Sequence, residues 1–158
     1  MVIPAELEAG APVRHTASRM SQANVVIVRR MYEAFQAGDA ERALAHFDQD
    51  VLVEATGRVD TGAGRGPEAV SSLVGSWVGA FDEWSEEIEE MRDLGDQVCV
   101  VATQRGRGKE TGLPVEYRYA VLYEIRGGRI THMTLHPDTE TALEAAAASR
   151  QAEPNAPR

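Results

Sequence analysis

The chain has 158 residues, enough for one domain with a buried core. Its 25 acidic residues outnumber 16 basic residues, and the formal charge of −9 argues against nucleic acid and anionic membrane surfaces as partners, because both bind cationic faces. The sequence has no apolar run long enough to cross a membrane and only one cysteine, Cys99, so we expect a cytoplasmic protein without an internal disulfide.

The two ends of the sequence lack hydrophobic periodicity. Residues 1–20 and 149–158 are polar and unpatterned, which predicts a flexible N-terminal extension and a disordered tail. Between them, residues 21–148 form a single predicted domain.

The domain begins with a helical pattern. Apolar residues recur at helical spacing within residues 21–39, which predicts an amphipathic helix. We expect Gly38 to end this helix and Asp39 to act as the N-cap of a second helix over residues 40–47.

A short strand and a longer helix complete the first half. The strand is predicted for residues 50–55, and the helix for residues 64–81, with Pro67 in the first turn, where a missing N–H costs nothing. The glycine-rich stretch at residues 62–66 does not have the spacing of a nucleotide-binding motif, and we interpret it as a loop.

The second half of the domain consists of strand-like runs separated by turn signals. Residues 138–150 then predict a closing helix with Asp138 as its N-cap, which we favour over a catalytic role for that aspartate. Helices followed by an antiparallel meander indicate an α+β fold in which the helices cover one face of a curved sheet. The four predicted strands span residues 84–94, 97–108, 115–125 and 129–136.

Four segments in this order carry a resemblance to a known family: VRRMYEAFQAGD (28–39), FDQDVLVEA (47–55), GRGPEAV (64–70) and VLYEIRGGRITHMTLHPDTETALEAA (121–146). Together they resemble the SnoaL-like branch of the nuclear transport factor two-like superfamily. The resemblance implies a cone-shaped fold, in which a curved antiparallel sheet is wrapped by N-terminal helices around one apolar pocket. It also implies a homodimer built on the outer face of the sheet. Members include polyketide cyclases, ketosteroid isomerases and limonene epoxide hydrolases.

The resemblance locates the catalytic positions of these enzymes in this sequence. The aspartate that cyclases and epoxide hydrolases carry on the last strand falls on Leu135. The isomerase base falls on Ala55, and its second, protonated aspartate falls near Val121. All of these acids are therefore replaced. The isomerase tyrosine falls on Met31, with Tyr32 next to it, and the arginine and second aspartate of the epoxide hydrolases fall near Gln104 and Gly106.

His132 and His136 have the spacing H-x-x-x-H, which suits a metal site on a helix. Both lie in a predicted strand, where residues four apart stand about 13 Å from each other, at roughly 3.3 Å per residue. Two ligands of one zinc ion must each lie about 2.0–2.1 Å from it, so the pair cannot chelate a metal. We expect no metal and no cofactor.

Alternation along the strands assigns their faces. On the last strand Thr131, Met133 and Leu135 share a face, which the resemblance makes the pocket side. The other face of that strand, where a dimer partner is expected, carries Ile130, His132, Thr134 and His136.

The candidate pocket residues combine apolar and hydrogen-bonding side chains. Tyrosines on the third strand of the meander either donate hydrogen bonds to a ligand or serve as amphipathic core residues, and Gln104 either contacts a ligand or is structural. Trp77, like Trp84, either caps the pocket or belongs to the core. The ten candidates are Met31, Ala55, Trp77, Gln104, Tyr117, Tyr119, Val121, Tyr123, Met133 and Leu135.

Three functions remain open from the sequence. The first is a binding protein for a small apolar or aromatic molecule, because the family's acids are missing. The second is a cyclase-like or isomerase-like enzyme acting on a small hydrophobic substrate through positioning and hydrogen bonds from tyrosine and glutamine. The third is an interaction module that uses the outer face of the sheet. The catalytic residues of an enzyme are not identifiable from the sequence.

Overall fold

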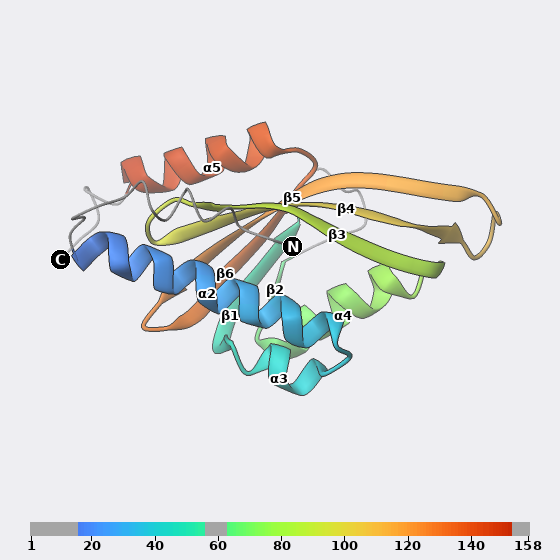
Figure 1. Ribbon diagram of the computed structural model, residues 1–158, viewed down its shortest axis with the longest axis horizontal. Helices are drawn as coiled ribbons and strands as arrows, with labels where there is room; N and C mark the ends of the chain where they lie inside the picture. The colour runs from blue at the N-terminus through green and yellow to red at the C-terminus, as the bar shows by residue number, and fades with distance from the viewer. Residues whose placement is uncertain (1–15, 56–62, 153–158) are drawn as a thin grey trace.

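The computed structural model describes residues 16–55 and 63–152, which form a curved, six-stranded sheet with helices on both faces (Figure 1). Helices α2 (Thr16–Gln36), α3 (Ala40–Leu44) and α4 (Pro67–Val78) lie on one side of the sheet, and α5 (Thr139–Ala152) lies on the other (Figure 1). The strands are β1 (Phe47–Ala55), β2 (Gly64–Arg65), β3 (Phe81–Asp93), β4 (Gln97–Gly108), β5 (Pro114–Arg126) and β6 (Arg129–His136).

The ends of the domain differ from the expected boundaries. Helix α2 begins at Thr16, before the predicted domain start at residue 21, and α5 continues to Ala152, past residue 150. The rest of the expected extension and tail, residues 1–15 and 153–158, lies outside the described residues. In the glycine-rich stretch that we interpreted as a loop, β2 forms a two-residue strand, while Gly62 is also outside the described part.

The N-terminal helices form for the reasons read from the sequence. Val28, Met31 and Tyr32 on α2 are buried against the sheet, as the helical spacing indicates. Gly38 ends the helical segment with a φ of 80°, a left-handed conformation that glycine adopts without steric cost. The carboxylate of Asp39 then accepts a hydrogen bond of 3.0 Å from the backbone N–H of Arg42, which caps α3.

The sheet has the strand order β2-β1-β6-β5-β4-β3. All neighbouring pairs are antiparallel except β1 and β6, which run parallel, so the curved sheet of the expected α+β fold is mixed, where the resemblance implied antiparallel pairing. The hairpin from β5 to β6 leaves the second edge of β6 open, and β1 pairs there in the same direction as β6. This pairing places Val53 beside Met133 and Ala55 beside Leu135.

A β-bulge at Thr131 reverses part of the predicted face assignment. Ile125 pairs with Ile130, but Glu124 pairs with His132, so Thr131 is the extra residue of β6. Its hydroxyl donates to the carbonyl oxygen of Glu124 over 3.3 Å. Ile130 therefore faces the main core, where it is fully buried, and its predicted place on the outer face is wrong.

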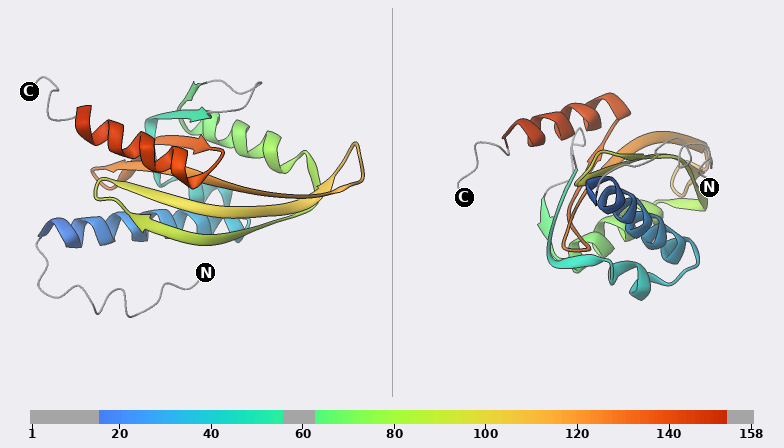
Figure 2. Two further views of the ribbon diagram at one scale, coloured as in Figure 1. Left: turned by 90° about the horizontal axis from the view of Figure 1, so that it is seen from above. Right: turned by 60° about the vertical axis from the view of Figure 1, so that its left-hand side comes forward.

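Two apolar clusters lie on opposite sides of the sheet. The larger cluster lies between helices α2, α3 and α4 and the inner faces of strands β1, β3, β4, β5 and β6. It contains Val100, Val121 and Tyr123. The smaller cluster lies between the sheet and α5 and includes Cys99, whose thiol is fully buried and whose pKa is raised by burial. Helix α5 thus covers part of the outer face, on which a dimer partner was expected (Figure 2). In the described residues, no helix is both long and apolar enough to span a membrane.

Candidate functional site

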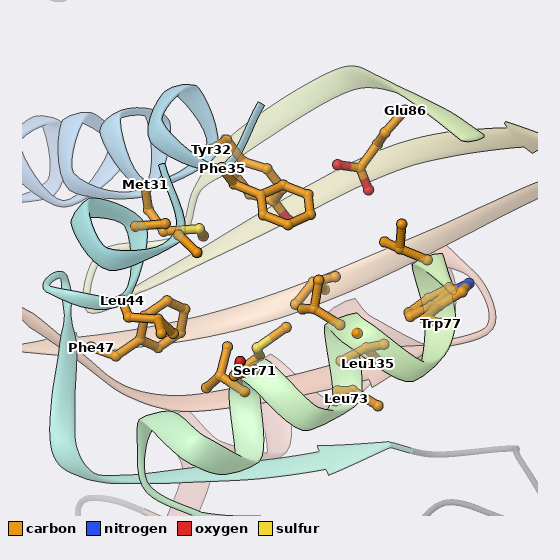
Figure 3. A pocket seen from close by; sticks show the side chains of 18 of the residues that line it. Met31, Tyr32, Phe35, Leu44, Phe47, Ser71, Leu73, Trp77, Glu86 and Leu135 are labelled. Carbon is orange, nitrogen blue, oxygen red and sulfur yellow. The ribbon is translucent and has the colours of Figure 1, made fainter. Parts of the chain in front are cut away.

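A cavity of about 340 Å³ lies between the inner face of the sheet and helices α2, α3 and α4 (Figure 3). Its walls are almost entirely apolar. The helices contribute, among others, Phe35, Leu44, Leu73 and Val74, and the sheet contributes Phe47, Val121, Met133 and Leu135.

The polar side chains of the cavity are concentrated on the wall formed by β3, β4 and β5. Glu86 on β3 pairs in register with Gln104 on β4, and both side chains line the cavity. Tyr119 on β5 lies opposite Ala102. Because Ala102 ends at its Cβ atom, the Tyr119 phenol has room to cross β4 and donate a hydrogen bond to Glu86 Oε2.

Glu86 is a carboxylate that our sequence analysis did not select. Its second oxygen, Oε1, is buried and has no hydrogen-bond partner among the described residues. Burial raises the pKa of this carboxyl group, and the hydrogen bond from Tyr119 offsets part of that increase. The alternation in β3 carried the missing signal, because Glu86 stands two positions from Trp84 and two from Ile88, which also face inward.

Gln104 is 3% exposed and is held by Trp84. The indole Nε1–H donates to Gln104 Oε1 over 2.9 Å. Since an indole can only donate, the amide oxygen must face Trp84, which leaves the amide NH₂ as the group available to a ligand. Trp84 follows Glu83, whose φ of 56° accompanies a bulge in β3.

Tyr32 and Tyr123 form a second polar pair inside the apolar wall. Their hydroxyl oxygens are 2.7 Å apart, and their rings meet edge to face with centroids separated by 6.0 Å. Burial raises the pKa of both phenols. Met31, on which the resemblance places the isomerase tyrosine, and its neighbour Tyr32 both line the cavity.

An aromatic group stands beside Glu86. The rings of Trp77 on α4 and Tyr119 have centroids 4.8 Å apart, and Tyr117 stacks on Tyr119 at 6.1 Å. Tyr117 and Ala55 pack against the core cluster beside the cavity instead of lining it. The other eight candidates from the sequence line the cavity together: Met31, Trp77, Gln104, Tyr119, Val121, Tyr123, Met133 and Leu135.

The histidines of β6 lie away from the cavity. His132 Nε2 is 2.9 Å from Glu54 Oε2 in the neighbouring strand β1. His136 at the end of β6 is 4% exposed, and burial lowers its pKa. Asp138 caps α5 by accepting a 2.7 Å hydrogen bond from the backbone N–H of Thr141. No three His, Cys, Asp or Glu side chains of the described residues gather as metal ligands.

Comparisons with known proteins agree with this architecture. A family model described as SnoaL-like domain matches residues 28–133. A nuclear transport factor two-like protein from Burkholderia xenovorans LB400 is 28% identical, with a TM-score of 0.64 over 79% of this chain and 96% of that chain. A second such protein, from Burkholderia thailandensis E264, is 22% identical, with a TM-score of 0.66 over 78% and 95%.

A third similar structure contains a ligand. It is a Mycobacterium tuberculosis protein in complex with estradiol-17beta-hemisuccinate, 21% identical, with a TM-score of 0.60 over 75% of this chain and 95% of that chain. Among curated proteins, none matches this chain.

Proposed function

Because this chain belongs to the SnoaL-like domain family of the nuclear transport factor two-like superfamily, we propose that it binds a small, largely apolar molecule in the cavity beneath α2, α3 and α4. The observation that carries the proposal is the cavity itself. Its volume of about 340 Å³ and its apolar lining, with polar side chains concentrated on one wall, are typical of pockets for small organic ligands. The Mycobacterium tuberculosis protein supports this proposal, because it has a similar fold and its structure contains a steroid-derived ligand.

Intrinsic fluorescence offers a direct test. Both tryptophans of the chain, Trp77 and Trp84, line the cavity, so a bound molecule changes their emission. We expect apolar probes such as 2-naphthol or progesterone to change the emission saturably. Val121→Phe, which places a larger side chain in the cavity, should abolish the effect.

The matched control is Leu113→Phe. Leu113 is 63% exposed, so the same gain in aromatic surface occurs outside the cavity and should leave binding unchanged. Probe binding that survives Val121→Phe would contradict the proposal. The proposal would also be contradicted if none of a panel of apolar probes, 2-naphthol and progesterone among them, bound to the wild type.

A second candidate function is an enzyme that moves a proton on a small hydrophobic substrate. Glu86 is the specific observation in its favour, because a cavity-lining carboxylate with a raised pKa, one of whose oxygens has no hydrogen-bond partner among the described residues, suits general acid–base catalysis of an isomerisation, cyclisation or dehydration. Tyr119 and the Gln104 amide would orient the substrate. The test is the pH–rate profile of any turnover found: Glu86→Gln should remove the limb that the carboxylate controls, whereas an unchanged profile would exclude this role.

We also propose a cytoplasmic location, which the single cysteine suggests.

We further propose a homodimer through the part of the outer face that α5 leaves uncovered. That face carries Arg105 between Glu87 at 3.1 Å and Glu116 at 2.7 Å. Such alternating charges are self-complementary when two copies meet about a two-fold axis. Light scattering after size exclusion should give twice the chain mass, and Arg105→Glu should shift the protein to monomer. A wild-type monomer would refute the dimer.

A further inference from the structure

The described lining of the cavity contains a carboxylate but no cationic side chain to balance it. Among the described lining residues, Glu86 is the only acidic side chain, and arginine, lysine and histidine are absent. Within residues 16–55 and 63–152, its only hydrogen-bond partner is the neutral Tyr119 phenol. A carboxylate in apolar surroundings is costly to ionise unless an opposite charge accompanies it.

The other glutamates of β3 show what Glu86 lacks. Glu87 is 3.1 Å from Arg105, and Glu89 is 3.1 Å from Arg118, both on the outer face. Glu83 and Glu90 also meet arginines, at 3.9 and 3.0 Å. Each of these outward glutamates therefore has an arginine partner, whereas Glu86, on the inner face, has none among the residues that the structure describes.

Aromatic surface adjoins this unbalanced carboxylate. Tyr119, which donates to Glu86, lies with its ring centroid 4.8 Å from that of Trp77. Trp84 also lines the cavity and packs edge to face on Phe35 at 6.0 Å. The faces of such rings carry negative potential and attract organic cations, most strongly where water is excluded.

We propose that the ligand of this cavity carries an alkyl or aryl ammonium group, which sits between the Glu86 carboxylate and the Trp77–Tyr119 ring pair. The proposal rests on the proposed binding function and names the chemical class of its ligand. The apolar remainder of the molecule fills the space lined by Val121, Met133 and Leu135. Glu86 serves as the counter-ion, and the ring pair excludes water from the charge.

This arrangement fixes the pH dependence of binding. The groups that face Glu86 from the neighbouring elements are Tyr119 on β5, Tyr32 on α2 and Gln104 on β4. The raised pKa values of Tyr32, Tyr119 and Tyr123 keep these phenols neutral below about pH 10, so Glu86 is the group that titrates. Affinity for a permanent cation should fall as the pH decreases through the raised pKa of Glu86, because the protonated acid no longer supplies a negative charge.

The experiment compares two probes of the same shape. Benzyltrimethylammonium carries a permanent positive charge, and neopentylbenzene replaces its nitrogen with carbon. Titrations followed by tryptophan emission at pH 8 and 0.15 M salt should show the cation binding at least about tenfold more tightly. Glu86→Gln should remove this preference, with a loss of about 10- to 100-fold in affinity for the cation and little change for the neutral probe.

Glu83→Gln is the matched control. It removes the same charge from an exposed residue of the same strand that does not line the cavity, and it should leave both affinities unchanged. Tighter or equal binding of neopentylbenzene to the wild type would overturn the cation proposal while leaving the binding function intact. An unchanged preference in Glu86→Gln would also overturn it. Failure of both probes and of the apolar panel would refute the proposed function together with this inference.

Discussion

The hydrogen bond between Tyr119 and Glu86 yields the most informative stability prediction. When Glu86 is ionised this bond is charge-assisted, and such bonds contribute about 1.5–3 kcal/mol. Tyr119→Phe leaves the carboxylate without any partner, so we expect a loss of about 1.5–3 kcal/mol at pH 8. For a chain of this size the midpoint of thermal unfolding should fall by roughly 3–12 °C.

Replacing Glu86 has two opposing effects. Glu86→Met removes a buried charge that has no cation beside it, which stabilises the fold, but it leaves the Tyr119 hydroxyl without an acceptor, which costs about 1–3 kcal/mol. The double variant Glu86→Met/Tyr119→Phe replaces both partners by apolar groups. It should therefore be more stable than either single variant, with a coupling energy of about 1.5–3 kcal/mol.

The stability of the wild type relative to the double variant should also decrease as the pH rises. The pKa of Glu86 in the folded protein is raised above its ordinary value of 4.5, so the unfolded chain ionises first as the pH rises. Wild-type stability relative to the double variant is highest below pH 4.5 and decreases as the pH rises through the folded pKa.

Urea unfolding at pH 4 and pH 8, followed by circular dichroism, measures the free energies of unfolding of the wild type, the two single variants and the double variant. Tyr117→Phe is the control, because Tyr117 stacks on Tyr119 but has no hydrogen bond to Glu86, and it should change stability by less than about 0.5 kcal/mol. A coupling energy below about 0.5 kcal/mol would refute the assignment of Glu86 as a carboxylate held in the cavity by Tyr119. The same conclusion would follow if the stability difference between the wild type and the double variant were equal at both pH values.

Three further predictions concern the surrounding structure. Gly106→Ala should destabilise the protein by about 1–3 kcal/mol in urea unfolding, because the new Cβ atom would lie 3.0 Å from Phe81 Cβ; a neutral effect would contradict the close packing. Tyr32→Phe or Tyr123→Phe alone should cost about 1–3 kcal/mol and the double variant less than their sum, since each single change leaves one buried hydroxyl without its partner. Cys99 should react slowly with Ellman's reagent in the native protein and rapidly in urea; fast native labelling would mean that α5 does not cover it.

Local patterns predicted most of the secondary structure correctly. The alternation and turn signals placed β4 and β6 at the observed residues, and Gly38 with Asp39 marked the junction between α2 and α3. The parallel pairing of β1 with β6 was not predictable in this way. It joins segments about 80 residues apart, and nothing in the sequence of either strand specifies the direction of its neighbour.

The site was only partly predictable for two physical reasons. The bulge at Thr131 shifts the alternation of β6 by one residue, so Ile130 turned inward against expectation. Glu86 was overlooked because β3 contains many glutamates, and a charged residue in such a run is ordinarily solvated. The alternation of Trp84, Glu86 and Ile88 distinguishes it once each position in the strand is assigned to a face.

The small side chain at Ala102 has a consequence for tracing this site among relatives. A branched or longer residue there would fill the space through which Tyr119 reaches Glu86, and the carboxylate would lose its tether even though neither partner had changed. Glutamate, alanine and tyrosine at these three positions on adjacent strands thus form a signature that can be read in any aligned sequence. Lineages that keep all three are expected to share one ligand chemistry, and a larger residue at position 102 is expected to accompany a different one.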